Sequence, residues 1–215
     1  MNFEVVEPSI EKNQTKRRPR NIMDNINEIS EFLQPARTAL VLWDIQKMLV
    51  DNIFNKDEFL KNVRTLSAAA REKNIPIFLT KITPLPERFQ SAANRYMMKK
   101  RALGSRPAPD AYELVLKPEG DDIVLNKNTA SIFTGTNFEL MIRNAGISTI
   151  LLTGIATEFG IESSAREAST KGFLPIVISD AVSSRSQEGH SRSLENMKSI
   201  LPLVTTAELT AFWKK

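Results

Sequence analysis

Short, uninterrupted apolar runs alternate along this chain with longer stretches in which apolar residues recur every three or four positions. An uninterrupted run rich in β-branched residues is typical of a strand buried on both faces of a parallel sheet. Apolar residues spaced three and four apart are typical of an amphipathic helix. The sequence therefore predicts strands at residues 38–44, 75–80, 122–127, 149–153, 174–180 and 203–205.

Helices are predicted between these strands. Asp24 is placed to cap a first short helix that ends before Pro35, and Gly154 is expected to end the fourth strand in a tight turn. Longer helices are expected at 57–73, at 137–145, from 157 onward, at 187–200 and at 207–213. Six strands that alternate with helices predict an α/β fold of three layers, in which helices cover both faces of a six-stranded parallel sheet.

Two segments stand outside this alternation. Residues 1–21 are polar and charged without a period, so we expect a flexible or surface-draped N-terminal arm before a single domain at 22–215. From Lys81 to Pro109 the pattern dissolves into prolines, basic residues and the cluster at 96–98. An irregular insertion after a strand is where α/β enzymes carry lids and substrate loops, and a plain surface excursion is an equal alternative.

The composition excludes several kinds of site. The chain has 215 residues, of which 41% are hydrophobic and 25% charged, as in an ordinary globular domain. It contains no cysteine, which excludes disulfides, thiolate zinc sites and a cysteine nucleophile. His190 is the only histidine, so we expect no metal site. The turns at Gly135 and Gly154 match neither a phosphate loop nor a dinucleotide fingerprint, so no cofactor is expected.

Charge and hydropathy bear on partners and location. The formal net charge is +4, but the basic residues are scattered apart from clusters at 16–20 and 99–101, and neither accompanies a recognisable nucleic-acid-binding fold. No apolar run approaches the ~20 residues that cross a bilayer. The N-terminus holds Glu4, Glu7 and Glu11 and lacks the apolar segment of a secretory signal. We expect a soluble, cytoplasmic protein that binds neither nucleic acid nor a membrane.

Candidate chemistry gathers at three strand ends. Asp44 ends the first strand, Lys127 ends the third, and the turn from Gly154 to Gly160 follows the fourth. A single Asp after a strand is more often a cap or turn residue. In an open α/β sheet, however, the carboxyl ends of the strands converge on one crevice, where a helix N-terminus offers N–H groups to a ligand. We therefore expect the three positions to form one site.

The residues at these positions resemble the isochorismatase-like hydrolase family. The match spans roughly residues 39–204, and the ordered set of motifs is specific although no single motif is. The resemblance implies a Rossmann-like arrangement of the sheet and assembly as a homodimer or larger homo-oligomer. The motifs are Trp43-Asp44-Ile45-Gln46, then Asn126-Lys127 followed by Ser131 to Thr136, then Leu152 to Thr157 followed by Glu162 to Ala168.

Most members of that family are amidases with an Asp, Lys and Cys triad. The resemblance places the Asp at Asp44 and the Lys at Lys127, whereas the cysteine position holds Gly160. True isochorismatases also keep the Asp and the Lys and carry glycine at that point. Their reaction cleaves a vinyl ether by delivering a proton to the methylene carbon and adding water to the oxocarbenium carbon. It needs no nucleophilic side chain.

The resemblance leads to a hypothesis for the chemistry. Asp44 would be the general acid, Lys127 would bind a substrate carboxylate or stabilise charge, and Gly160 would leave open space over the helix amides. The substrate would be a small, anionic molecule, and isochorismate, with release of pyruvate, is the first to test. Burial raises the pKa of a carboxyl and a nearby lysine lowers it, so the protonation state of Asp44 stays open.

Further residues are carried over as candidates for substrate binding. Gln46 lies two residues beyond Asp44, as in relatives, where it would position the acid; an ordinary turn amide is the alternative. In the family, the peptide bond at the position of Ala156–Thr157 is commonly cis and turns its backbone groups into the pocket. His190 is expected to shape a helix cap or a subunit contact.

Two alternatives to the general-acid hydrolase remain open. One is a family member that has lost catalysis and serves as a binding or oligomeric scaffold, which the missing thiol motivates. The other is an amide hydrolase in which water attacks directly with Asp44 as the base. A pocket closed by side chains would favour the scaffold. The segment 84–109, which is expected to line the pocket, has no residue match to the family.

Overall fold

The computed structural model describes residues 26–100 and 107–214, so the predicted N-terminal arm and the cap at Asp24 lie outside the described residues. Its six parallel strands form one sheet in the order β3-β2-β1-β4-β5-β6. This order confirms the predicted fold class, with the chain winding outward on both sides of β1 and β4. The strands are β1 (Thr38–Trp43), β2 (Ile77–Ile82), β3 (Ile123–Lys127), β4 (Thr149–Ile155), β5 (Leu174–Ser183) and β6 (Leu203–Val204).

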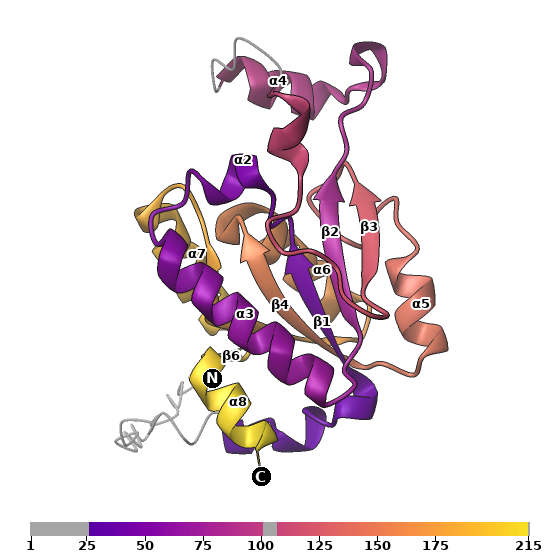
Figure 1. Cartoon of the computed structure of the whole chain (residues 1–215), viewed down its shortest axis with the longest axis vertical. Helices are drawn as coiled ribbons and strands as arrows, with labels where there is room; N and C mark the ends of the chain where they lie inside the picture. The colour runs from indigo at the N-terminus through magenta and orange to yellow at the C-terminus, as the bar shows by residue number, and fades with distance from the viewer. Residues whose placement is uncertain (1–25, 101–106, 215) are drawn as a thin grey trace, which may run out of the picture.

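Helices cover both faces of the sheet (Figure 1). Leu42 of β1 belongs to the hydrophobic cluster under α3 and α8, and Trp43 belongs to the cluster under α5 and α6. Because β1 is buried on both faces, its apolar run is uninterrupted. No helix in the described part has the length and apolarity to span a bilayer. The helices are α2 (Lys47–Val50), α3 (Lys56–Glu72), α4 (Ala92–Lys100), α5 (Phe138–Asn144), α6 (Glu162–Thr170), α7 (Gln187–Lys198) and α8 (Thr206–Trp213), with short turns η1 (Ser30–Phe32), η2 (Pro35–Arg37), η3 (Glu87–Phe89), η4 (Pro109–Tyr112) and η5 (Thr157–Ile161).

Strand β4 continues through Gly154, which the sequence predicted to end it. Gly154 pairs with Trp43 of β1, and a Cβ there would lie 2.1 Å from the carbonyl oxygen of Trp43. Glycine is therefore required by the close approach of two strands and by its φ of +117°, rather than by a turn. The chain turns after a cis peptide bond between Ile155 and Ala156, one residue earlier than the predicted bond at Ala156–Thr157.

The segment from Lys81 to Pro109 is not irregular throughout, as the sequence predicted. Strand β2 runs on to Ile82, and helix α4 forms within the segment. Figure 1 shows α4 beyond the carboxyl ends of the strands, away from the sheet. No residue of α4 is buried. A short helix with no buried stripe leaves no helical period in the sequence, which is why the pattern did not predict it.

Candidate active site

The carboxyl ends of β1 and β3 bring Asp44 and Lys127 into contact. Nζ of Lys127 lies 2.6 Å from Oδ2 of Asp44, and each side chain is 4% exposed. The lysine ammonium also donates a hydrogen bond to the carbonyl oxygen of Thr129 at 3.2 Å. Asp44 itself has a φ of 48°, so the chain turns sharply where β1 ends. The expected convergence of these two strand ends is therefore present as a buried ion pair.

Thr80 of the neighbouring strand β2 completes the surroundings of the carboxylate. Its hydroxyl donates a hydrogen bond to Oδ1 of Asp44 at 2.6 Å and accepts one from the backbone N–H of Asp44 at 2.9 Å. Both oxygens of the buried carboxylate therefore have a donor. Sequence reasoning missed Thr80; the available signal was its position at the end of the apolar run 75–80.

Burial opposes a charge on both members of this pair. It raises the pKa of the Asp44 carboxyl, and this effect outweighs the lowering by the Lys127 charge and by hydrogen bonds from Lys127 and Thr80. Burial also lowers the pKa of the Lys127 ammonium, against the attraction of Asp44. Of the two opposing effects that the sequence left open, burial is therefore the larger for the pKa of Asp44.

Trp43 fills the space beside Gly160. A Cβ at residue 160 would lie 2.0 Å from Nε1 and 2.3 Å from Cε2 of the Trp43 indole, which is 1% exposed. The prediction that Gly160 leaves open space is therefore wrong, because the side chain that precedes Asp44 occupies it. Nζ of Lys127 lies 4.0 Å from the centroid of the same ring. The ammonium is thus held between a carboxylate and an aromatic face.

The π-helical turn η5 carries the other predicted residues. Thr157 is fully buried, and its hydroxyl lies 3.1 Å from the carbonyl oxygen of Ser183 and 2.8 Å from Nδ1 of His190. Its side chain is therefore engaged with β5 and α7, while Ala156 is half-buried beside the same cluster as α3. Burial lowers the pKa of His190, against the charge of Glu158, which favours the neutral imidazole. His190 thus joins η5 to α7.

The side chain of Gln46 links the end of β2 to the turn η4 beside this site. Its side-chain amide donates hydrogen bonds to the carbonyl oxygens of Ile82 at 3.2 Å and Tyr112 at 2.7 Å, and its oxygen accepts from the N–H of Ile82 at 2.9 Å. Gln46 is fully buried. These bonds tie the end of β2 to η4, so the contribution of Gln46 that the structure displays is to the loop and not to the Asp44 carboxylate.

Replacing Gln46 by leucine is expected to lower the free energy of unfolding by about 2 kcal/mol or more, because each buried backbone group left without a partner costs about 1 to 3 kcal/mol. Urea unfolding would measure this. Gln34→Leu is the matched control, since the Gln34 side chain is exposed. An equal effect of the two substitutions would contradict the role of Gln46 as a link between β2 and η4.

A cavity of about 440 Å³ opens at the carboxyl ends of β2 and β3. Lys81 and Asn126, which are register partners in the sheet, line it together with Tyr112 of η4. Pro84, Pro107 and Pro109 also line this cavity, whereas Asp44, Lys127 and Gly160 are not among its lining residues. The lining of the active-site pocket by the segment 84–109 therefore stays a prediction. The described residues include no cluster of three or more histidine, aspartate and glutamate side chains that could hold a metal ion.

Comparison with known proteins identifies relatives of the whole domain. The Isochorismatase domain family model matches residues 38–208. The isochorismatase family protein YecD of Escherichia coli is 30% identical over 185 residues, which cover 82% of this chain and 95% of YecD. The isochorismatase of Bacillus subtilis is 30% identical over 173 residues, 79% of this chain but only 55% of that protein. A cysteine hydrolase from Pseudomonas syringae has the same fold, with a TM-score of 0.76 and 19% identity over 84% of this chain and 93% of its own.

Proposed function

The chain belongs to the isochorismatase family of hydrolases, and we propose that it cleaves a small anionic substrate with Asp44 as general acid and without a covalent intermediate. The observation that carries this proposal is the buried Asp44 carboxyl, whose pKa burial raises although Lys127 lies 2.6 Å away. The absence of cysteine from the chain and the indole packed over Gly160 both argue against a thiol nucleophile.

A vinyl ether is the substrate class that we propose. Asp44 protonates the terminal methylene carbon, and the electrons of the double bond form the new C–H bond. Water adds to the resulting oxocarbenium carbon and returns a proton to the site, and the hemiketal collapses to a 2-keto acid and an alcohol. Lys127 stabilises the carboxylate that proton transfer leaves on Asp44. Because its ammonium already contacts Asp44, Thr129 and the indole, we assign it this role rather than substrate binding.

Pyruvate release from isochorismate tests the proposal. We expect the wild type to release pyruvate and Asp44→Asn to release it on the order of 100-fold more slowly, since a positioned general acid contributes at least about that factor. Far-UV circular dichroism would show that the variant is folded. Equal rates in the two proteins, or no release from either, would count against the proposal.

The pH dependence separates the acid mechanism from direct water attack with Asp44 as base. A general acid must be protonated, so kcat/KM is expected to fall as pH rises through the pKa of Asp44, which burial places above that of an exposed aspartate. A general base must be ionised, so the rate would rise through the same pKa. Initial rates from pH 4 to 9 with a vinyl ether and with an amide distinguish the two.

A catalytically inactive scaffold is the second candidate, and the packing of Trp43 favours it. The indole closes the space in which the amidases of the family carry their nucleophile. Against it stands the buried pair of Asp44 and Lys127, because burying two ionisable side chains costs free energy that a scaffold has no need to spend. If wild type and Asp44→Asn are equally inactive on vinyl ethers and amides while the wild type is folded, the scaffold is preferred.

A further inference from the structure

Helix α4 (Ala92–Lys100) displays large apolar side chains without burying them. Tyr96 is 64% exposed, and Met97 and Met98 are half-buried. Phe89, in the turn just before the helix, is 61% exposed. An isolated helix of fewer than about 12 residues is marginal in water, so a helix of nine residues needs packing to be stable. The described part of the chain supplies little of that packing.

The charge of α4 indicates what kind of surface can cover it. The helix carries Arg95, Lys99 and Lys100 and contains no acidic residue. None of the three forms an ion pair with any residue that the structure describes. Two α4 helices brought face to face would repel each other, so a second α4 is not the complement. The complement is an acidic surface with apolar side chains beside it.

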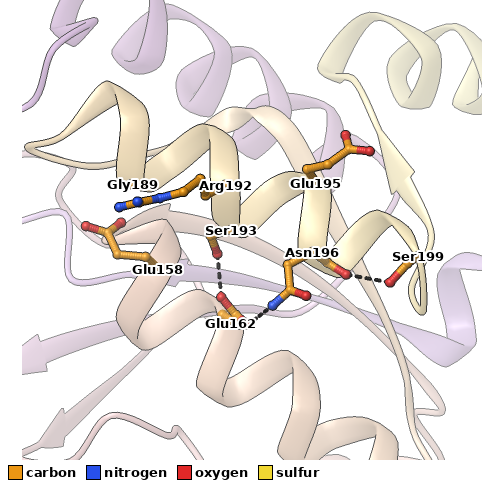
Figure 2. Close-up of a pocket in the computed structure, with 8 residues that line it drawn as sticks. All are labelled: Glu158, Glu162, Gly189, Arg192, Ser193, Glu195, Asn196 and Ser199. Carbon is orange, nitrogen blue, oxygen red and sulfur yellow. Dashed lines mark hydrogen bonds between the residues drawn. The ribbon is translucent and has the colours of Figure 1, made fainter.

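Such a surface lies on the same chain, in a groove between η5, α6 and α7 (Figure 2). The groove has a volume of about 620 Å³ and is lined by the carboxylates of Glu158, Glu162 and Glu195 against the single guanidinium of Arg192. We call it the acidic groove. Of these carboxylates, Glu162 is already paired with Arg166, whereas Glu158 and Glu195 have no ion pair within the described residues.

Exposed apolar residues flank the acidic groove. Phe159, next to Glu158 in η5, is 51% exposed. Ile200, next to the groove residue Ser199, is 56% exposed. The acidic groove and α4 are thus complementary in two independent ways, in the sign of their charge and in their exposed aromatic side chains. Tyr and Arg are also the residues that most often dominate binding energy at interfaces.

We propose that α4 of one molecule docks in the acidic groove of a second copy of this chain. The lysines and Arg95 of α4 then face Glu158 and Glu195, and Tyr96 packs beside Phe159. If α4 of each molecule docks in the acidic groove of the other, the same interface occurs twice, related by two-fold symmetry, and the assembly closes as a dimer. The proposal concerns assembly alone and does not rest on the proposed reaction.

Charge reversal on the two surfaces tests the proposal in the full-length protein. Sedimentation velocity is expected to show wild-type dimers. The α4 variant combines Lys99→Glu with Lys100→Glu, and the groove variant combines Glu158→Lys with Glu195→Lys. Each variant is expected to raise the dimer dissociation constant at least about 10-fold, because like charges then meet. An equimolar mixture of the two variants is expected to dimerise again, because each α4 then meets a groove of opposite charge.

The mixture is the decisive measurement, since a variant that has merely lost its fold cannot be rescued by the other. Lys61→Glu with Arg64→Glu is the matched control, because it makes the same change of charge on the exposed face of α3. The control is expected to leave the dimer intact. The proposal would be overturned if the wild type stays monomeric or if neither charge reversal changes the dimer dissociation constant. It would also be overturned if the two variants stay monomeric when mixed.

Discussion

Replacing Lys127 by methionine is expected to lower the free energy of unfolding by about 3 to 5 kcal/mol, the usual cost of removing one partner from a buried ion pair. Asp44 would remain 4% exposed, without the ammonium that now lies 2.6 Å from Oδ2. Its Oδ1 would keep the hydroxyl of Thr80. The loss is therefore mainly that of charge compensation, and chemical denaturation at pH 8 would measure it.

The loss of unfolding free energy in Lys127→Met is expected to depend on pH. Without Lys127, the pKa of Asp44 in the folded protein rises further above its value in the unfolded chain, which is about 3.9. A carboxyl with a raised folded pKa contributes stability at low pH that is lost as pH rises through that pKa. The difference between wild type and variant should therefore be small near pH 4 and should grow toward pH 8.

Two further variants identify the cause of the loss. Asp44→Asn combined with Lys127→Met removes both charges, so it should be more stable than Lys127→Met alone and should lose most of the pH dependence. Lys73→Met removes an exposed lysine and should change stability by less than about 0.5 kcal/mol. A deficit that is the same at pH 4 and pH 8, or that the double substitution leaves unchanged, would contradict a buried ion pair.

Replacing Gly160 by alanine is expected to cost about 3 kcal/mol, the upper end of the range for overpacking a core. The added methyl would lie 2.0 Å from Nε1 of Trp43, which is a rigid ring buried on all sides. The Trp43 side chain cannot rotate into solvent, so either its ring or the turn η5 must shift. Thermal or urea unfolding would measure the cost.

The contact partner can be identified by a double-mutant cycle. In a Trp43→Leu background the indole is gone, so Gly160→Ala should cost less than about 1 kcal/mol there. Gly189→Ala is the matched control, because a Cβ at that helical glycine meets its neighbours at an ordinary 3.4 Å. An equal cost of Gly160→Ala in both backgrounds would show that the indole is not what excludes a side chain at this position.

Most of the sheet could be predicted from local pattern. The apolar runs predicted six strands, and the structure places a strand within or across each of them. Boundaries were less accurate where tertiary pairing sets them: β2 begins after Pro76 and extends to Lys81 and Ile82, because these pair with Asn126 and Lys127 of β3. Helix α4 was missed because no buried stripe marks it.

The site was partly predictable for the same reason. The carboxyl ends of parallel strands lie at the same edge of the sheet, so the order of the elements was enough to expect Asp44 near Lys127. The structure shows their side chains in contact. Thr80 required knowledge of which strand lies beside β1. The assignment of Gln46 to the acid, and the position of the cis bond, rested on resemblance to relatives, and the backbone of this chain places these features differently.

The sequence by itself determined the α/β architecture, the lack of a thiol and the two charged residues that end β1 and β3, because these depend on residue type and local order. Only the tertiary structure decided that burial outweighs Lys127 in setting the pKa of Asp44, and that Trp43 fills the space beside Gly160. Both depend on which side chains distant in the chain exclude water from one another, and desolvation and packing have no local signature in a sequence.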